Sequence, residues 1–182
     1  MRIFLTGLPG CGKSTILLNV IEILKQKGVK IGGIITPEKR EKGKRIAFLV
    51  KDVYSGKENF LAKLQAGEKN KLKVGKYVVF KEEFEEIALP ALDFALKNCD
   101  IIVIDEIGRM ESFSEKFMEV VKEILESDKP ILAVVHRKFV KNFQTFGEIV
   151  WVTKDKVNEL TNKIVDKILA YLEAKNHGSG ES

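Results

Sequence analysis

Two kinds of hydrophobic pattern alternate along the chain: short apolar runs, and longer segments in which apolar residues recur every three to four positions. The short runs, which predict strands, occupy residues 2–5, 30–36, 45–53, 76–80, 100–104, 130–135 and 148–152. The segments with helical spacing occupy residues 13–27, 82–97, 114–127 and 155–174. Strands that alternate with helices in this way predict an α/β fold with a mostly parallel sheet.

Polar and punctuating residues show where this alternation is interrupted. Residues 30–80 contain apolar runs joined only by polar segments rich in Gly and Lys, so we expect an antiparallel excursion there. Pro90 interrupts the helical segment 82–97 and predicts a kink or a break. We therefore predict a single doubly wound domain over residues 1–175 and a disordered tail at 176–182.

Composition narrows the class of protein. The 182 residues are 45% hydrophobic and 31% charged, which is typical of a soluble globular domain. No apolar run is long enough to span a membrane and the N-terminus has no signal-peptide pattern, so we expect a cytoplasmic protein with no membrane partner. We also expect a monomer in which Cys11 and Cys99 are free thiols, because the two lie at opposite ends of the predicted sheet.

The net charge of +5 changes this picture little. It suits an anionic substrate such as a nucleoside triphosphate. The Lys residues are interspersed with Glu, however, which is more typical of a solvated surface than of a nucleic-acid interface. RNA binding therefore has only weak support.

The strongest chemical signal is the stretch GLPGCGKS, which fits the phosphate-binding pattern G-x-x-x-x-G-K-[ST] between a predicted strand and a predicted helix. Its glycines let backbone N–H groups surround phosphate oxygens at a helix N-terminus. Lys13 supplies a cation to the β- and γ-phosphates, Ser14 supplies a hydroxyl to Mg²⁺, and Thr15 approaches the α-phosphate. The predicted nucleotide-binding residues of this loop are Gly7, Leu8, Pro9, Gly10, Cys11, Gly12, Lys13, Ser14 and Thr15.

A second signal lies where the apolar run 100–104 turns acidic, at Asp105 and Glu106. Burying two adjacent carboxylates is costly unless a cation or a reacting water uses them. We predict that Asp105 holds Mg²⁺ together with Ser14, and that Glu106 polarises the attacking water. The predicted nucleotide-binding residues of this segment are Ile102, Val103, Ile104, Asp105, Glu106, Ile107, Gly108 and Arg109.

The same segment, DEIG, also satisfies the D-x-x-G pattern of GTPases. The guanine-reading pattern N/T-K-x-D is incomplete, because TKDK at residues 153–156 ends in Lys156 instead of Asp. Without that carboxylate, the amide and amino groups of guanine lose their acceptor. We therefore predict weak base selectivity, with Lys154 flanking the base.

Several further residues are candidates for the γ-phosphate. Arg40 and Arg45 flank a glycine in a basic loop, and we assign Arg45 as the catalytic arginine, with Arg40 and Arg109 as alternatives. His136 ends a buried strand at the edge of the sheet where ligands bind. Glu111 is a candidate for orienting basic neighbours. Trp151 is predicted to lie in the core, and the absence of a Cys/His cluster predicts that the metal arrives with the nucleotide.

These motifs together resemble the P-loop nucleoside-triphosphatase family found in thermophiles, called cancer-related nucleoside triphosphatase in vertebrates. The matching stretches are GLPGCGKST (7–15), TPEKREKGKRIAF (36–48), VGKYVVF (74–80), FEEIALPAL (84–92), DEIGRMESF (105–113) and VTKDK (152–156). The resemblance implies the P-loop NTPase fold and a slow Mg²⁺-dependent hydrolysis of several nucleoside triphosphates to the diphosphate and phosphate. The chain departs from the family at Arg109, where the family usually has Lys, and at Ser112–Phe113, where it usually has Leu-Phe.

Two alternatives remain open at this point. A nucleotide or small-molecule kinase on the same scaffold would need an acceptor pocket and a closing lid with several arginines. A nucleotide-dependent RNA-binding switch would show an RNA affinity that depends strongly on salt.

Overall fold

The computed structural model describes residues 1–64 and 72–178. Its centre is a sheet in which five strands run parallel, in the order β10 (Glu148–Trp151), β1 (Arg2–Thr6), β9 (Ile131–Val135), β8 (Ile101–Ile107) and β2 (Ile31–Ile35). Strand β9 therefore lies between β1 and β8. The carboxyl ends of these strands meet at one edge, where α/β sheets bind ligands.

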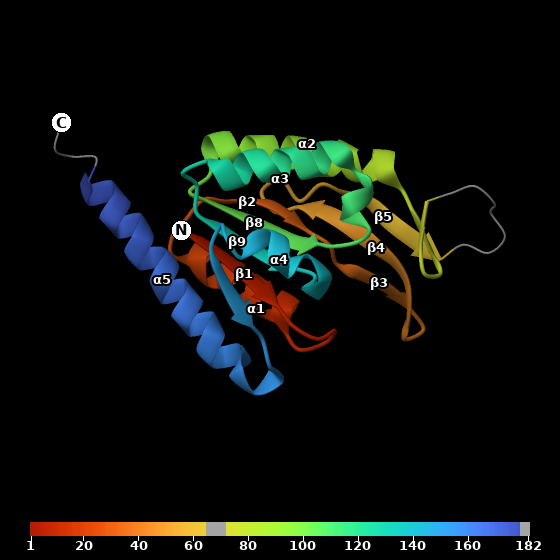
Figure 1. Ribbon diagram of the computed structural model, residues 1–182, viewed down its shortest axis with the longest axis horizontal. Helices are drawn as coiled ribbons and strands as arrows, with labels where there is room; N and C mark the ends of the chain where they lie inside the picture. The colour runs from red at the N-terminus through yellow and green to blue at the C-terminus, as the bar shows by residue number, and fades with distance from the viewer. Residues whose placement is uncertain (65–71, 179–182) are drawn as a thin grey trace.

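The sheet continues beyond β2 through antiparallel strands that form one end of the molecule (Figure 1). These are, in sheet order, β4 (Lys44–Asp52), β5 (Glu58–Leu64), β7 (Tyr77–Val79) and β6 (Lys73–Val74), with β3 (Glu38–Glu41) paired to β4. The antiparallel excursion is thus confirmed, but it begins after β2. That strand pairs parallel with β8 on one side and antiparallel with β4 on the other.

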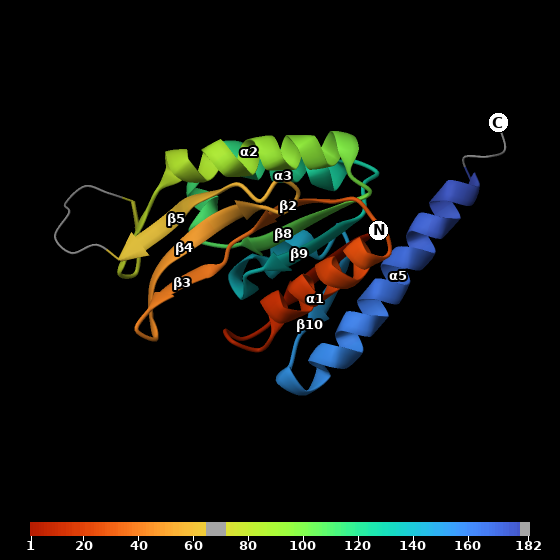
Figure 2. The ribbon, with the colours of Figure 1, turned by 180° about the vertical axis from the view of Figure 1, so that it is seen from behind.

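Helices cover both faces of the parallel strands, as a doubly wound fold requires (Figures 1 and 2). The helices α1 (Lys13–Gln26) and α5 (Val157–Gly178) lie on one face, and α2 (Lys81–Asn98) and α3 (Glu115–Glu126) lie on the other. The short helix α4 (Val140–Phe143) follows β9. Side chains alternate along β1 between the two cores: Ile3 and Leu5 pack with the α1 side, and Phe4 packs with the α2 side.

Two local features show why the chain folds this way. The hydroxyl of Ser114 accepts a hydrogen bond from the N–H of Phe117 at 3.0 Å, which caps α3 as predicted. Gly33 has a φ of +120°, and a Cβ at this position would lie 1.9 Å from the carbonyl oxygen of Val103. Only glycine therefore allows β2 and β8 to approach so closely.

Most predicted elements are confirmed, and some expectations are wrong. Pro90 lies inside the single helix α2, so the predicted break is wrong, while the alternative, a kink, stays a prediction. Residues 176–178 belong to α5 instead of a disordered tail, while residues 179–182 lie outside the described residues. Trp151 is 59% exposed because it ends β10, which is an edge strand.

Two further findings concern the chain as described. Cys11 and Cys99 are free and buried, as expected. In the described ranges, every helix is too short or too polar to cross a lipid bilayer.

Candidate active site

The phosphate-binding loop connects β1 to α1 at the carboxyl edge of the sheet. Gly7, Gly10 and Gly12 all have positive φ values, of 149°, 71° and 105°. A Cβ at Gly7 would lie 2.9 Å from the carbonyl oxygen of Val152, and one at Gly12 would lie 2.5 Å from a methyl group of Val157. The glycines are therefore required both by the curvature of the loop and by its packing against the segment that follows β10.

Lys13 stabilises the curled loop from inside. Its Nζ donates hydrogen bonds to the carbonyl oxygens of Gly7 and Leu8, both at 3.0 Å. These bonds keep the ammonium group over the loop, where a bound phosphate would meet it. The side chain of Leu8 itself is 62% exposed.

A hollow of about 400 Å³ opens over the loop, and we call it the phosphate hollow. Its lining consists of Pro9, Gly10, Gly12, Lys13, Ser14, Thr15, Glu38, Arg45, Phe48 and Glu106. The structure thus brings together the loop and Glu106, which lie far apart in the sequence. Gly7, Leu8 and Cys11 do not line the hollow.

Strand β8 carries Asp105 to this edge. The carboxyl group is 5% exposed and accepts a hydrogen bond from the hydroxyl of Ser14. Burial, and then the neighbouring charge of Glu106, raise the pKa of Asp105 to about 7. A carboxyl group in this position gains strongly from a nearby cation.

Glu106 is half-buried and lies near Lys13 and His136. Burial raises the pKa of its carboxyl group, while the charges of Lys13 and His136 act in the opposite direction. His136 reaches this position because it follows β9, the strand between β1 and β8. Its Nδ1 accepts a hydrogen bond from the N–H of Lys138 at 3.2 Å, which fixes the orientation of the ring.

The apolar residues of β8 on either side of the two carboxylates lie in the cores and not at the hollow. Ile102, Val103, Ile104 and Ile107 are at most 1% exposed and pack in the two cores. They position the acidic pair and do not line the phosphate hollow, and their predicted nucleotide contact stays a prediction. Hydrophobic periodicity in the sequence could not distinguish a core-packing residue from one that contacts the nucleotide.

The structure distinguishes the three candidate arginines. Arg45 lines the phosphate hollow, where its Nε donates to the hydroxyl of Tyr77 and its Nη1 donates to Glu38, both at 2.8 Å. Arg40 donates to the other carboxylate oxygen of Glu38 at 2.9 Å and lines neither this hollow nor the next one. Arg109 is exposed and lines a second hollow beside Glu106.

The second hollow measures about 260 Å³. Its lining consists of Ser14, Thr36, Glu38, Phe48, Leu61, Val74, Asp105, Glu106, Gly108, Arg109, Met110, Glu111 and His136. Ser14, Glu38, Phe48 and Glu106 line both hollows. The two cavities therefore share a wall that contains Glu106.

Sequence reasoning missed Glu38, which lines both hollows, and assigned the wrong partners to Glu111. Glu111 is 5% exposed and accepts a hydrogen bond from the N–H of Gly108. Burial, followed by the charges of Glu106 and Asp105, raises its pKa to about 8. Among residues 1–64 and 72–178 it forms no ion pair with Arg or Lys, so it does not orient basic neighbours.

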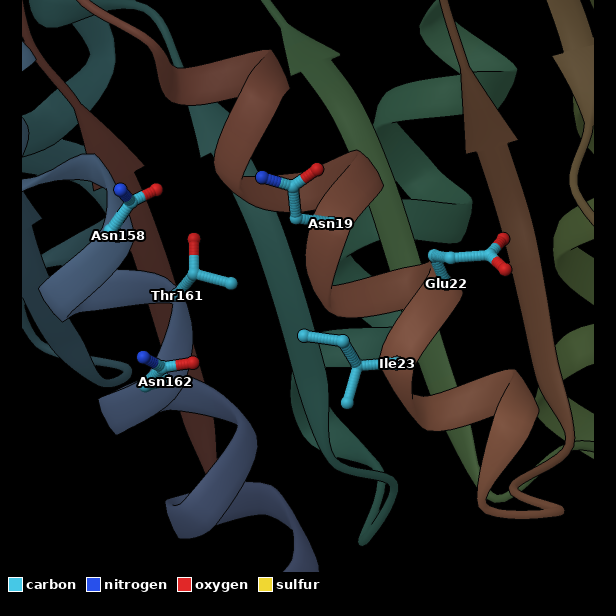
Figure 3. A pocket seen from close by; sticks show the side chains of 6 residues that line it. All are labelled: Asn19, Glu22, Ile23, Asn158, Thr161 and Asn162. Atoms are coloured by element: carbon cyan, nitrogen blue, oxygen red, sulfur yellow. The ribbon is translucent and has the colours of Figure 1, made fainter.

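A third hollow, of about 270 Å³, lies between α1 and α5 and is lined by Asn19, Glu22, Ile23, Asn158, Thr161 and Asn162 (Figure 3). Asn19 and Ile23 project from α1, and Asn158 and Asn162 from α5. None of its lining residues lines the phosphate hollow. It is therefore separate from the site. The TKDK segment at 153–156 immediately precedes α5 and lines none of these three hollows.

Comparisons with known proteins agree with this arrangement. A family model described as NTPase matches residues 2–165. The chain is 46% identical over 172 residues to nucleoside-triphosphatase THEP1 of Methanocaldococcus jannaschii, covering 94% of this chain and 99% of that protein.

Two solved structures share the fold. The crystal structure of THEP1 from the hyperthermophile Aquifex aeolicus has a TM-score of 0.77 at 29% identity, over 92% of this chain and 99% of that one. The solution structure of a human cancer-related nucleoside triphosphatase has a TM-score of 0.78 at 33% identity, over 93% and 97% of the two chains. By sequence along nearly its whole length and by its fold, the chain belongs to the nucleoside-triphosphatase (NTPase) family.

Proposed function

We propose that this nucleoside-triphosphatase hydrolyses nucleoside 5′-triphosphates to the diphosphate and phosphate, with Mg²⁺ and with little selectivity for the base. The observation that carries the proposal is the joint placement of Lys13, Ser14 and Glu106 around one hollow, with Asp105 hydrogen-bonded to Ser14. Each of these groups has a distinct task in phosphoryl transfer to water.

Binding of the triphosphate uses the loop. The backbone N–H groups of the glycine-rich turn and the N-terminus of α1 attract the phosphate oxygens. Lys13 exchanges its bonds to the loop carbonyls for contacts with the β- and γ-phosphates. Thr15 lines the same hollow and is exposed, so its hydroxyl is available to the α-phosphate.

The residues present fit a magnesium ion. Mg²⁺ prefers oxygen ligands and usually binds through one or two protein groups together with phosphates and water. The hydroxyl of Ser14 and the carboxylate of Asp105 supply such oxygens, and Asp105 is a buried acid with no ion-pair partner in the described part of the chain. In the described ranges, no group of three or more His, Cys, Asp or Glu residues could hold a metal alone. When bound with the nucleotide, the ion would neutralise charge on the phosphate oxygens.

Glu106 is placed to accept the proton of the attacking water. Its carboxylate lines the phosphate hollow, and Lys13 and His136 favour its ionised form. The oxygen of the water forms a bond to the γ-phosphorus as the bond to the β,γ-bridging oxygen breaks, and the diphosphate leaves. Arg45 is the arginine that faces the charge developing on the γ-phosphoryl group, and His136 lines the neighbouring hollow together with Glu106.

Glu106→Gln provides the direct test. The amide keeps the size of the side chain but cannot take the proton, so the turnover number should fall by about 10²–10⁴ while MgATP binding is nearly retained. The control is Glu119→Gln, the same change at an exposed position on α3. Phosphate release and calorimetric binding of MgATP should be measured for all three proteins. Hydrolysis by Glu106→Gln at the parent rate would show that Glu106 is not the base.

Base selectivity is tested separately with ATP, GTP, CTP and UTP. We expect their kcat/KM values to lie within about two orders of magnitude, because a site that pairs with polar groups of its substrate discriminates by roughly 10⁴ or more. A preference for one base of that larger size would contradict the proposal.

A further inference from the structure

We infer that the second hollow, which we call the acceptor pocket, binds a small uncharged or cationic alcohol with an apolar body, and that its hydroxyl group can take the γ-phosphoryl group in place of water. The inference rests on the proposed function, because it uses the same nucleotide and the same Glu106.

The position of the pocket is the first argument. Glu106 lines both this pocket and the phosphate hollow, together with Ser14 and Phe48. A hydroxyl group bound on the far side of Glu106 can therefore reach the carboxylate that activates water. Proximity of this kind turns a bound alcohol into a strong competitor of solvent.

The size of the pocket is the second argument. A water molecule in the liquid occupies about 30 Å³. The pocket, at about 260 Å³, is far larger than hydrolysis requires and lies just below the usual range of small-molecule sites. It fits a compound of modest size.

The composition of the walls defines the chemistry of that compound. One side is apolar, formed by Phe48, Leu61, Val74 and Met110. These side chains come from the antiparallel strands and from the segment after β8. These apolar side chains favour contact with the apolar part of a ligand and do not form hydrogen bonds with water.

The other side is acidic and selects against anions. Asp105, Glu106 and Glu111 line it, together with Arg109 and His136. Glu38 is also present, but Arg40 and Arg45 neutralise it. An anionic acceptor such as a nucleoside monophosphate would meet the ionised carboxylate of Glu106, whereas a neutral or cationic one would not be repelled by it.

The chemical step parallels hydrolysis. The oxygen of the alcohol forms a bond to the γ-phosphorus as the bond to the β,γ-bridging oxygen breaks. The hydroxyl proton moves to Glu106, and the products are a phosphate monoester and the nucleoside diphosphate. Hydrolysis is the outcome when the pocket contains only water.

Three probes with the same apolar body test the inference: 2-phenylethanol, 2-phenylethylamine and phenylacetate. The protein is incubated with MgATP and 2-phenylethanol, and phosphorus NMR measures 2-phenylethyl phosphate and inorganic phosphate in one sample. We expect the ratio of ester to phosphate to rise and saturate with alcohol concentration. The amine, as a cation, should lower this ratio, and phenylacetate at the same concentration should not.

A matched pair of variants locates the effect. Val74→Phe fills the pocket from β6 and should lower the ester-to-phosphate ratio about tenfold or more. Leu72→Phe adds an aromatic ring at a neighbouring exposed position outside the pocket and should leave the ratio unchanged. Because the ratio is internal to each sample, differences in total turnover do not affect it.

The possible results separate the two proposals. Phosphate release without any ester at all alcohol concentrations overturns this inference and leaves the proposed function intact. An ester yield that rises linearly and is equal in both variants also overturns it, because the alcohol then reacts from solution. Absence of both products would refute the proposed function itself.

Discussion

Replacing Glu111 by Gln should remove a large pH dependence from the stability of the nucleotide-free protein. In the folded state, burial and the charges of Glu106 and Asp105 raise the pKa of Glu111 from 4.5 to about 8. The folded protein therefore binds more protons than the unfolded chain between these values. By linkage, the free energy of unfolding must fall as the pH rises from about 4.5 to about 8.

The magnitude follows from the size of the shift. One pKa unit corresponds to about 1.4 kcal/mol, so the change at Glu111 amounts to roughly 5 kcal/mol across this range. A Gln side chain still offers an oxygen to the N–H of Gly108 but does not titrate. The variant should thus match the parent near pH 5 and become progressively more stable than it toward pH 9.

Urea unfolding at pH 5, 6, 7, 8 and 9, without Mg²⁺ and nucleotide, measures this difference. Asp105 and Glu106 also have raised pKa values and lower the stability of both proteins in the same direction, so the informative quantity is variant minus parent. Glu119→Gln, at an exposed position, should follow the parent at every pH. A variant-minus-parent difference that stays constant from pH 5 to pH 9 would refute the reasoning.

Three other outcomes can be checked on the same protein. Lys13→Ala should weaken MgATP binding and abolish phosphate release, and unchanged calorimetric affinity with full turnover would contradict the phosphate-binding assignment. The pKa of Asp105 is about 7, and the metal needs the ionised carboxylate. The affinity for MgATP, measured by calorimetry, should therefore fall about tenfold from pH 8 to pH 6. In Asp105→Asn the binding should be weaker and should not change with pH. In urea unfolding, Gly33→Ala should lower the free energy of unfolding by about 3 kcal/mol or more. Gly56→Ala, whose Cβ enters open space, should lower it by only about 1–2 kcal/mol. Equal losses in the two variants would contradict the close approach of β2 and β8.

Sequence patterns predicted those elements in which the order of apolar and polar residues directly reflects burial. The apolar runs at 100–104 and 130–135 became the buried strands β8 and β9, and α1 lies within one residue of its predicted end. Strand β5 was missed although it contains the buried residues Leu61 and Ala62. Strand β3 was missed because all its residues, EKRE, are exposed, so no hydrophobic alternation marks it. Its pairing with β4 holds it in the sheet.

The phosphate-binding loop and the acidic pair were readable from the sequence because their chemistry depends on short spacings. Glycines with positive φ, a lysine and a hydroxyl must follow one another within one turn to surround a phosphate. Two adjacent carboxylates next to a buried apolar run likewise indicate that a cation or a reacting water is bound there. Local order alone was therefore enough to predict which residues would contact the triphosphate and the metal.

Only the tertiary structure decided which residues surround the phosphate-binding loop and the acidic pair. Strand β9 enters the sheet between β1 and β8, which brings His136 beside Glu106. The antiparallel strands fold over the same edge and place Glu38 and Arg45 in the phosphate hollow. These contacts join residues far apart in the sequence, and no local spacing encodes them, because they arise from the order and pairing of strands.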